Sequence, residues 1–134
     1  MKPMACALFL LTLAASAGAA AEIDWQRFQD EDVIEVVTRN EDGALRETSV
    51  WIVAFDGHGY VRTNDSRWLA NIRRGSDVVL RLGEDEFAVA AREPDDPAID
   101  ARVEEGFKQK YGFMQRVMSV FRMTEPTVLE LTAR

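Results

Sequence analysis

Four arginines lie close together in a chain whose overall charge is negative: Arg62, Arg67, Arg73 and Arg74. The segment between the first two contains Asn, Asp and Ser, which are good helix caps. This pattern predicts a strand end followed by a helix start. A guanidinium group can donate two parallel hydrogen bonds to the oxygens of one phosphate. A helix N-terminus attracts anions through its unpaired N–H groups. The segment is therefore a candidate anion-binding site.

Two interpretations of this segment remain open on the sequence alone. Thr63 and Ser66 could add hydroxyl donors to a phosphate, whereas Asp65 would repel it. In the alternative, the arginines form surface ion pairs with nearby aspartates and glutamates, each pair contributing about 0–1 kcal/mol. The presence of Asp65 favours the ion pairs, and the anion site stays a hypothesis.

The other reactive side chains do not form a catalytic or metal-binding cluster in the sequence. His58 is the only histidine, and because it lies between Gly57 and Gly59 we expect it in a solvated turn. Metal sites need several converging ligands, and a serine nucleophile needs a base held beside it. We therefore predict no metal site. A hydrolase using His58 would require the turn to fold over a pocket.

Two tryptophans bear on the candidate site. Trp51 is central in the most apolar strand of the chain, so we expect it in the core. Trp68 follows Arg67 at the predicted helix start. Its indole is either a core side chain or a ring that stacks on a flat ligand.

The N-terminal segment is typical of a secretory leader. Lys2 precedes an apolar run from Met4 to Ala17, and small residues continue to Ala21. The apolar run is shorter than the about 20 residues that cross a bilayer, so we predict a cleavable signal peptide over residues 1–21. The alternative is an uncleaved anchor. Cleavage would give a periplasmic or secreted protein without a stable membrane anchor.

Residues 22–134 are expected to fold as one domain. Without Lys2 they carry 15 basic and 23 acidic residues, a net charge of −8. Nucleic acids and anionic membranes bind basic surfaces, so this balance argues against both as partners. The only cysteine, Cys6, would leave with the leader. A hydrophobic core must then supply the stability, without disulfides.

Alternating apolar residues predict a mainly antiparallel sheet with flanking helices. Strands are expected over 32–40, 45–56, 60–64, 78–82, 87–92 and 127–132, with hairpins joining the first two and the fourth and fifth. Helices are expected over 21–29, 67–74 and 99–111 and from Phe113 to Phe121. This order favours a mainly β, α+β fold: a six-stranded antiparallel barrel with helices packed outside it.

Several short motifs together form a pattern shared with a known group of proteins. They are Thr38-Arg39, Asp42-Gly43, Arg46, Trp51, Tyr60 to Thr63, Trp68, Asn71-Ile72, Val78 to Leu82 and Lys110-Tyr111-Gly112. The pattern resembles the flavin-binding split β-barrels, and two of their branches are similar: the pyridoxamine-phosphate oxidases and the deazaflavin-dependent nitroreductases. The nearest likeness is to a small bacterial group of that superfamily whose function is uncharacterised.

The resemblance implies a six-stranded split β-barrel that forms a homodimer, with FMN or a deazaflavin bound between two chains. In the oxidase branch an arginine, a Tyr-Thr pair and a Ser-Arg-Lys hold the phosphate. Arg62 replaces that tyrosine, and Trp68 replaces the lysine. The implied cofactor site has the phosphate on Arg46, Arg62, Thr63, Ser66 and Arg67 and the ring system against Trp68. The chemistry would be a redox step carried by the cofactor.

A second hypothesis keeps the barrel without the cofactor, as a binding or structural protein of the cell envelope. The missing lysine and Asp65 favour it. The export route favours it too, because the leader has no twin-arginine pair and the chain would cross the membrane unfolded, with no cofactor bound. The sequence leaves both hypotheses open.

Overall fold

The computed structural model describes residues 22–112 and 126–134. The predictions of a leader over residues 1–21 and of a helix from Phe113 to Phe121 lie outside the described residues. Within the described ranges, no helix has both the length and the apolar character needed to cross a membrane.

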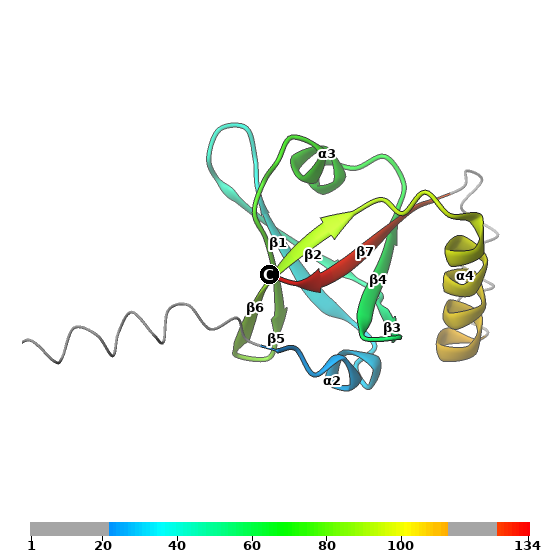
Figure 1. The fold of residues 1–134 in the computed structure, drawn as a ribbon. Coiled ribbons are helices and arrows are strands. Elements are labelled where there is room, and N and C mark those ends of the chain that lie inside the picture. Colours follow the sequence, from blue (N-terminus) through cyan, green and yellow to red (C-terminus); the bar gives the residue numbers. More distant parts are fainter. Residues whose placement is uncertain (1–21, 113–125) are drawn as a thin grey trace, which may run out of the picture.

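One antiparallel sheet forms the body of the protein, with the strand order β2-β1-β5-β6-β7-β4-β3 (Figure 1). Its strands are β1 (Ile34–Arg39), β2 (Leu45–Val50), β3 (Val53–Phe55), β4 (His58–Thr63), β5 (Val78–Leu82), β6 (Asp85–Arg92) and β7 (Thr127–Ala133). The helices are α2 (Trp25–Gln29), α3 (Arg67–Arg73) and α4 (Pro97–Tyr111). The predicted barrel class and both predicted hairpins, β1–β2 and β5–β6, are confirmed.

The segment predicted as a single strand over 45–56 is divided in the structure. β2 and β3 lie at opposite ends of the strand order, and only Trp51 and Ile52 separate them. β2 pairs with β1, whereas β3 pairs with β4. Because the chain passes directly from one edge of the sheet to the other, the sheet must curl to bring these edges towards each other, although β2 and β3 are not paired. The six predicted strands therefore become seven.

At this division, side chains of α4 bond the peptide groups of Ile52, which takes no part in the strand pairings of the described residues. The Ile52 N–H donates to the hydroxyl of Tyr111 at 3.0 Å, and the Nζ of Lys110 donates to the Ile52 carbonyl at 2.6 Å. Tyr111 also donates to the carbonyl of Asp32 at 2.7 Å, and Lys110 to that of Phe28 at 3.1 Å. Unpaired buried backbone groups are costly, so these two side chains stabilise the closed barrel.

The same burial changes the proton affinity of both side chains. Loss of hydration lowers the pKa of Lys110 to about 8 and raises the pKa of Tyr111 to about 12. Tyr111 therefore keeps its proton at neutral pH and remains a hydrogen-bond donor as well as an acceptor.

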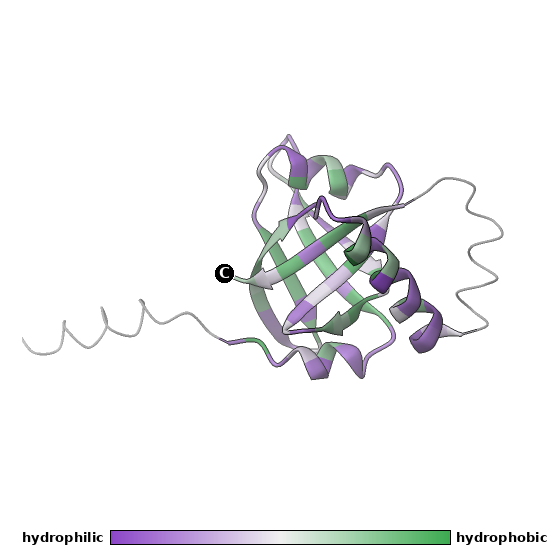
Figure 2. Cartoon of the chain, turned by 45° about the vertical axis from the view of Figure 1, so that its right-hand side comes forward, coloured by the Kyte–Doolittle hydropathy of each residue, from purple (hydrophilic) through white to green (hydrophobic). Residues whose placement is uncertain are grey.

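Two apolar clusters hold the elements together. The larger one fills the barrel, with α2 and α3 at its two ends (Figure 1). Its largest fully buried members include Phe28, Ile52, Leu69, Leu80, Leu129 and Leu131. The smaller cluster lies between α4 and the outer side of β3 and β4, while the outward side of α4 is hydrophilic (Figure 2). Ile99, Val103, Phe107 and Tyr111, predicted to share one helix face, all belong to it.

Replacing Tyr111 with phenylalanine removes the hydroxyl and leaves the buried N–H of Ile52 without its acceptor. We expect the free energy of unfolding to fall by about 1–3 kcal/mol, the cost of an unsatisfied buried polar group. Urea unfolding followed by circular dichroism measures the difference. Ser49→Ala removes an exposed hydroxyl from β2 and serves as the control, with an expected change below about 0.5 kcal/mol. Equal stability of the two variants would contradict the role given to Tyr111.

Candidate functional site

The predicted anion-binding segment forms a compact turn between β4 and α3. Ser66 caps α3, and its Oγ accepts from the N–H of Leu69 at 3.2 Å. The hydroxyls of Thr63 and Ser66 lie 2.9 Å apart. Arg67, the first residue of α3, is exposed and has no hydrogen bond or ion pair with any described residue. The structure thus brings Thr63 and Ser66 into contact, with Thr63 buried, and leaves the guanidinium of Arg67 exposed at the start of α3.

Arg62 points to the other side of β4 and contacts α4. Its Nη1 lies 2.6 Å from the Oε1 of Glu104, and its Cζ lies 4.0 Å from the centre of the Phe107 ring. Only 12% of its side chain is exposed. Successive residues of a strand point to opposite faces, so Arg62 and Thr63 do not share a surface in one chain.

The last two arginines of the group form surface ion pairs. Arg73 donates to both carboxylate oxygens of Glu93, at 2.8 and 2.7 Å, and these hydrogen bonds hold the pKa of Glu93 below its usual range. Arg74 lies 3.7 Å from the carboxylate of Glu41 and donates to the side-chain oxygen of Asn71 at 2.9 Å. The ion-pair interpretation therefore describes Arg73 and Arg74, and only Arg67 keeps an uncompensated charge within the group.

Arg46 belongs to a polar network between β1, β2 and α3. Its Nε donates to the side-chain oxygen of Asn40 at 2.9 Å, and the Nδ2 of Asn71 donates to the same oxygen at 2.9 Å. Asn71 also donates to the hydroxyl of Thr38 at 3.0 Å, and both of these side chains are buried. Arg46 is thus linked through Asn40 to Asn71 in the second half of α3, whereas Ser66 caps that helix and Arg67 begins it.

The two tryptophans are both packed against apolar side chains. Trp68 is 5% exposed and lies in the barrel core, which favours the core interpretation over stacking on a ligand. Trp51 stacks on Tyr111, with ring centres 4.2 Å apart and an interplanar angle of 5°. Trp51 therefore packs against the tyrosine that holds the barrel closed.

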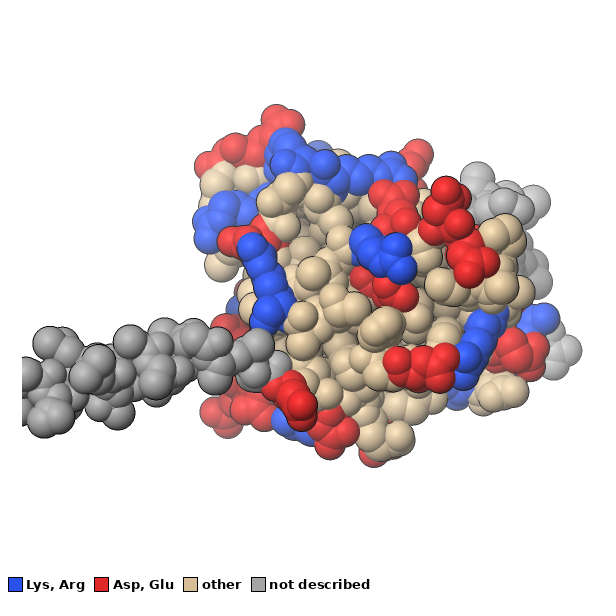
Figure 3. All heavy atoms as spheres, in the orientation of Figure 1, with Lys and Arg blue, Asp and Glu red and all other residues tan. Residues whose placement is uncertain are grey.

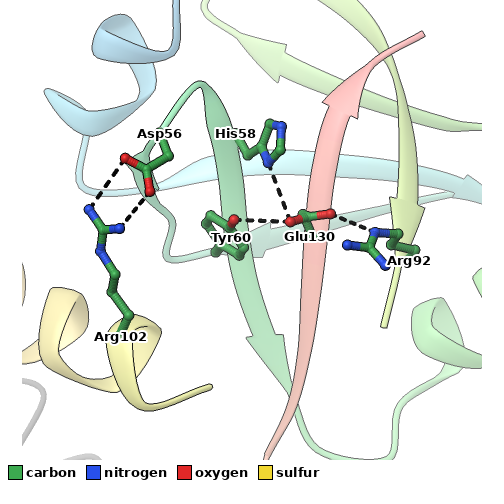
Figure 4. A network of polar contacts seen from close by, with 6 residues as sticks. All are labelled: Asp56, His58, Tyr60, Arg92, Arg102 and Glu130. Atoms are coloured by element: carbon green, nitrogen blue, oxygen red, sulfur yellow. Dashed lines mark hydrogen bonds and ion pairs between the residues drawn. The ribbon is translucent and has the colours of Figure 1, made fainter. Parts of the chain in front are cut away.

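A polar cluster that the sequence did not indicate lies on the outer face of the sheet (Figure 4). Its centre is Glu130 of β7, whose side chain is only 5% exposed. The Oε1 of Glu130 accepts from the Nε of Arg92 at 2.6 Å, and Oε2 accepts from the Tyr60 hydroxyl at 3.0 Å. The Nδ1 of His58 lies 3.3 Å from the same Oε2. The expectation that His58 lies in a turn is wrong, because it begins β4. Its side chain is in partial contact with solvent, as expected, with 39% exposed.

The donors around Glu130 determine its ionisation. Burial alone would raise its pKa, but hydrogen bonds from Arg92 and Tyr60 and the charge of Arg92 prevail, and the pKa of Glu130 is below its usual value. Burial, helped by the bond to Glu130, raises the pKa of Tyr60 to about 12. At neutral pH the cluster therefore contains an ionised carboxylate and a protonated phenol.

The strand register explains why sequence reasoning missed this cluster. Tyr60 and Arg92 are both direct cross-strand partners of Glu130, although they are 70 and 38 residues away from it. The available signal was an acidic residue in the middle of an apolar strand, and its partners became visible only with the β4–β7–β6 pairing. No group of three or more His, Cys, Asp or Glu side chains suited to a metal ion is present in the described part of the chain.

Several solved structures share this fold. The conserved hypothetical protein Rv2991 from Mycobacterium tuberculosis superposes with a TM-score of 0.67 at 19% identity, covering 87% of this chain and 84% of that one. HutZ, a heme storage protein from Vibrio cholerae, has a TM-score of 0.63 at 13% identity and coverages of 81% and 86%. An F420-H2-dependent reductase has a TM-score of 0.60 at 13% identity and coverages of 75% and 94%. Structures named for pyridoxamine 5′-phosphate oxidase, and one described as a domain-swapped dimer, are similar too. No curated protein matches the sequence.

These similarities define the class of the protein by its fold: a split β-barrel of the type found in pyridoxamine-phosphate oxidases and F420-dependent reductases, as the motifs predicted. Within this class, residues 24–134 match the bacterial family DUF2255, described as an uncharacterized protein conserved in bacteria, and the chain belongs to that family. The predicted likeness to an uncharacterised bacterial group is confirmed.

Glu130 makes the stability of the fold depend on pH in the acid range. Because the pKa of Glu130 is lower in the folded than in the unfolded chain, its stabilisation is present above the ordinary value of 4.5 and is lost as pH falls through the folded value. Glu130→Gln cannot ionise. We expect it to be about 1–3 kcal/mol less stable than the wild type at neutral pH, with the difference shrinking towards acid pH.

Urea unfolding at a series of pH values from neutral to about 3 measures this difference. Glu84→Gln changes an exposed glutamate in the β5–β6 turn and is the control, with a stability curve expected to follow the wild type. A difference between Glu130→Gln and wild type that stays constant across this range would show that ionised Glu130 is not what stabilises the fold.

Proposed function

We propose that this protein is an exported split barrel that binds a phosphorylated flavin-like cofactor, FMN or a deazaflavin, and uses it in an oxidoreductase reaction. The observation that carries the proposal is the exposed guanidinium of Arg67, which has no hydrogen bond or ion pair with any described residue and stands at the start of α3, next to the cap Ser66. Arginine and hydroxyl donors together suit a phosphate dianion. The fold is one that F420-dependent and pyridoxamine-phosphate-oxidase proteins share.

The residues fit the phosphate end of such a cofactor better than its ring end. Arg67 is exposed, whereas Thr63 is buried and its hydroxyl donates to the carbonyl of Asn64 at 2.8 Å and lies 2.9 Å from the hydroxyl of Ser66. The two hydroxyls would have to exchange these bonds for a phosphate. α3 has only seven residues, so the arginine side chain supplies most of the positive charge there. To bind the phosphate, Arg46 would have to give up its bond to Asn40. Arg62 would likewise have to give up its ion pair with Glu104. A bound flavin would supply hydride or electron transfer. The role of this chain would be to hold the phosphate of the flavin.

A homodimer is part of the proposal, because the outer face of the sheet carries a row of uncharged side chains. Val37 pairs with Val79 and Val79 with Ala88, while Ala90 pairs with Thr132. Both alanines are exposed, and Figure 3 shows an area with few charged side chains over β6 and β7. An uncharged sheet face suits a second copy of the chain. Sedimentation equilibrium gives the mass in solution, and a monomer at micromolar concentration would refute this part.

Export is also part of the proposal and is supported by the order of charge, apolar run and small residues in the leader. Intact mass of the protein recovered from the periplasm or medium is expected to correspond to a chain beginning at Glu22. A mass that retains residues 1–21 would refute cleavage.

The competing function is an envelope protein that keeps the barrel without a cofactor. Two observations favour it specifically: Arg62 is already paired with Glu104, and Trp68 is buried rather than open to a ring. On this view Arg67 is a solvated surface charge.

Fluorescence titration of the purified protein with FMN, repeated with a deazaflavin cofactor, separates the two functions. We expect saturable binding of one ligand per chain at micromolar concentration. Arg67→Ala is expected to weaken binding about tenfold or more, because a charge-assisted hydrogen bond contributes about 1.5–3 kcal/mol. Circular dichroism of each variant checks that the fold is retained.

Arg73→Ala is the matched control, because it removes an arginine from the same helix that is already bonded to Glu93. Its cofactor affinity is expected to equal that of the wild type. If Arg67→Ala and Arg73→Ala lost cofactor affinity equally, Arg67 would not be the residue that holds the phosphate. No binding of either cofactor by the wild type would leave the cofactor-less barrel as the function.

A further inference from the structure

The uncharged sheet face that we propose for the homodimer borders the polar cluster around Glu130. This Glu130 cluster consists of Glu130 and its three partners Tyr60, Arg92 and His58. Thr132 belongs to the uncharged face and pairs with Ala90, and continuing the β4–β7 register by one residue places His58 beside Thr132. Arg92 follows Ala90 by two residues on β6, so both point to the same side of the sheet. A second copy that covers Ala90 and Thr132 therefore also reaches His58 and Arg92.

At neutral pH the charged side chains around Tyr60 balance one another. Glu130 is ionised and accepts from the Nε of Arg92 at 2.6 Å. On the other side of Tyr60, Asp56 pairs with Arg102 of α4 (Figure 4). Tyr60 keeps its proton, because burial and the bond to Glu130 raise its pKa to about 12. Each carboxylate thus has one guanidinium partner, and these five side chains together carry no net charge.

His58 is the neighbour of this balanced group whose charge changes near neutral pH. Histidine ordinarily takes up a proton between about pH 8 and about pH 5, and the chain has only one. Its Nδ1 lies 3.3 Å from the Oε2 of Glu130, and 39% of its side chain is exposed. Further along β7, Arg134 is paired with Asp77 at 2.8 Å. Protonation of His58 therefore adds one positive charge to pairs that are already neutral.

This added charge is tolerated better in the free chain than under a second subunit. Glu130 attracts it in both states, but Arg92 already matches the negative charge of Glu130. In the free chain, water hydrates the exposed part of the imidazolium. A subunit placed over this face removes that water and brings a second imidazolium into the same interface. Loss of hydration by an uncompensated charge and repulsion between like charges both oppose association.

We propose that His58 lies in the interface between two copies of this chain and that its protonation dissociates the dimer as pH falls below neutral. This pH dependence rests on the proposed homodimer and does not require a bound cofactor. Because the free chain binds the proton more tightly than the dimer does, acid favours the free chain. With two histidines in each dimer, the dissociation constant rises by up to about a hundredfold per pH unit.

Sedimentation equilibrium of the purified protein at about pH 7.5 and about pH 5.5 tests the proposal. We expect the dissociation constant of the wild type to be at least about tenfold larger at the lower pH. His58→Gln takes up no proton and is expected to stay dimeric at both pH values. His58→Arg carries a permanent charge and is expected to dissociate at both. Circular dichroism checks the fold, and both pH values lie above the range in which Glu130 gains a proton.

Glu84→Gln removes a different titratable group, an exposed one in the β5–β6 turn, and is the control. Its dimer is expected to show the pH dependence of the wild type. A wild type that is equally dimeric at both pH values, or a His58→Gln dimer that dissociates in acid like the wild type, would overturn the role of His58 and leave the homodimer in place. A wild type that is already monomeric at about pH 7.5 would refute the homodimer and the role of His58 together.

Discussion

The barrel depends on how the peptide groups of Ile52 are satisfied where one strand passes from the first edge of the sheet to the last. β2 can pair only with β1 and β3 only with β4, so a residue between them has no neighbour in the ladder. A buried, unpaired N–H and carbonyl would favour opening at this point. Tyr111 of α4 supplies the missing acceptor and Lys110 the missing donor, so closure of the sheet depends on the docking of α4.

Docking of α4 also determines the character of the outer face. The helix covers β3 and β4 with the cluster of Val53, Tyr60, Val103 and Phe107, and it binds Arg62 through Glu104. No described helix covers the face over β6 and β7 beyond it. Glu130 lies at the boundary of the two regions, buried enough to need partners and near enough to the surface for Arg92 and His58 to reach it from the solvent side.

The arginines near α3 show how an acidic protein distributes its positive charge. Arg62, Arg73 and Arg74 each meet a carboxylate, and Arg46 meets an asparagine side chain. Surface pairs of this kind add little stability, about 0–1 kcal/mol each, but they neutralise the charge that an anion would otherwise find. Arg67 is the exception within the group, because it is exposed at the start of α3 and has no hydrogen bond or ion pair with any described residue.

The sequence by itself determined the local structure, because strand and helix periodicity, caps and turns act within a few residues. The hairpins, a helix cap among residues 64–66 and the shared face of Ile99, Val103 and Phe107 follow from it. The short motifs further identified the superfamily. Only the tertiary structure decided that the strand over 45–56 divides, that Trp68 is core and that Arg62 and Thr63 face apart. It also decided that His58, Tyr60 and Arg92 meet at Glu130. All of these contacts depend on strand register and barrel closure, which bring together residues that are distant in the chain.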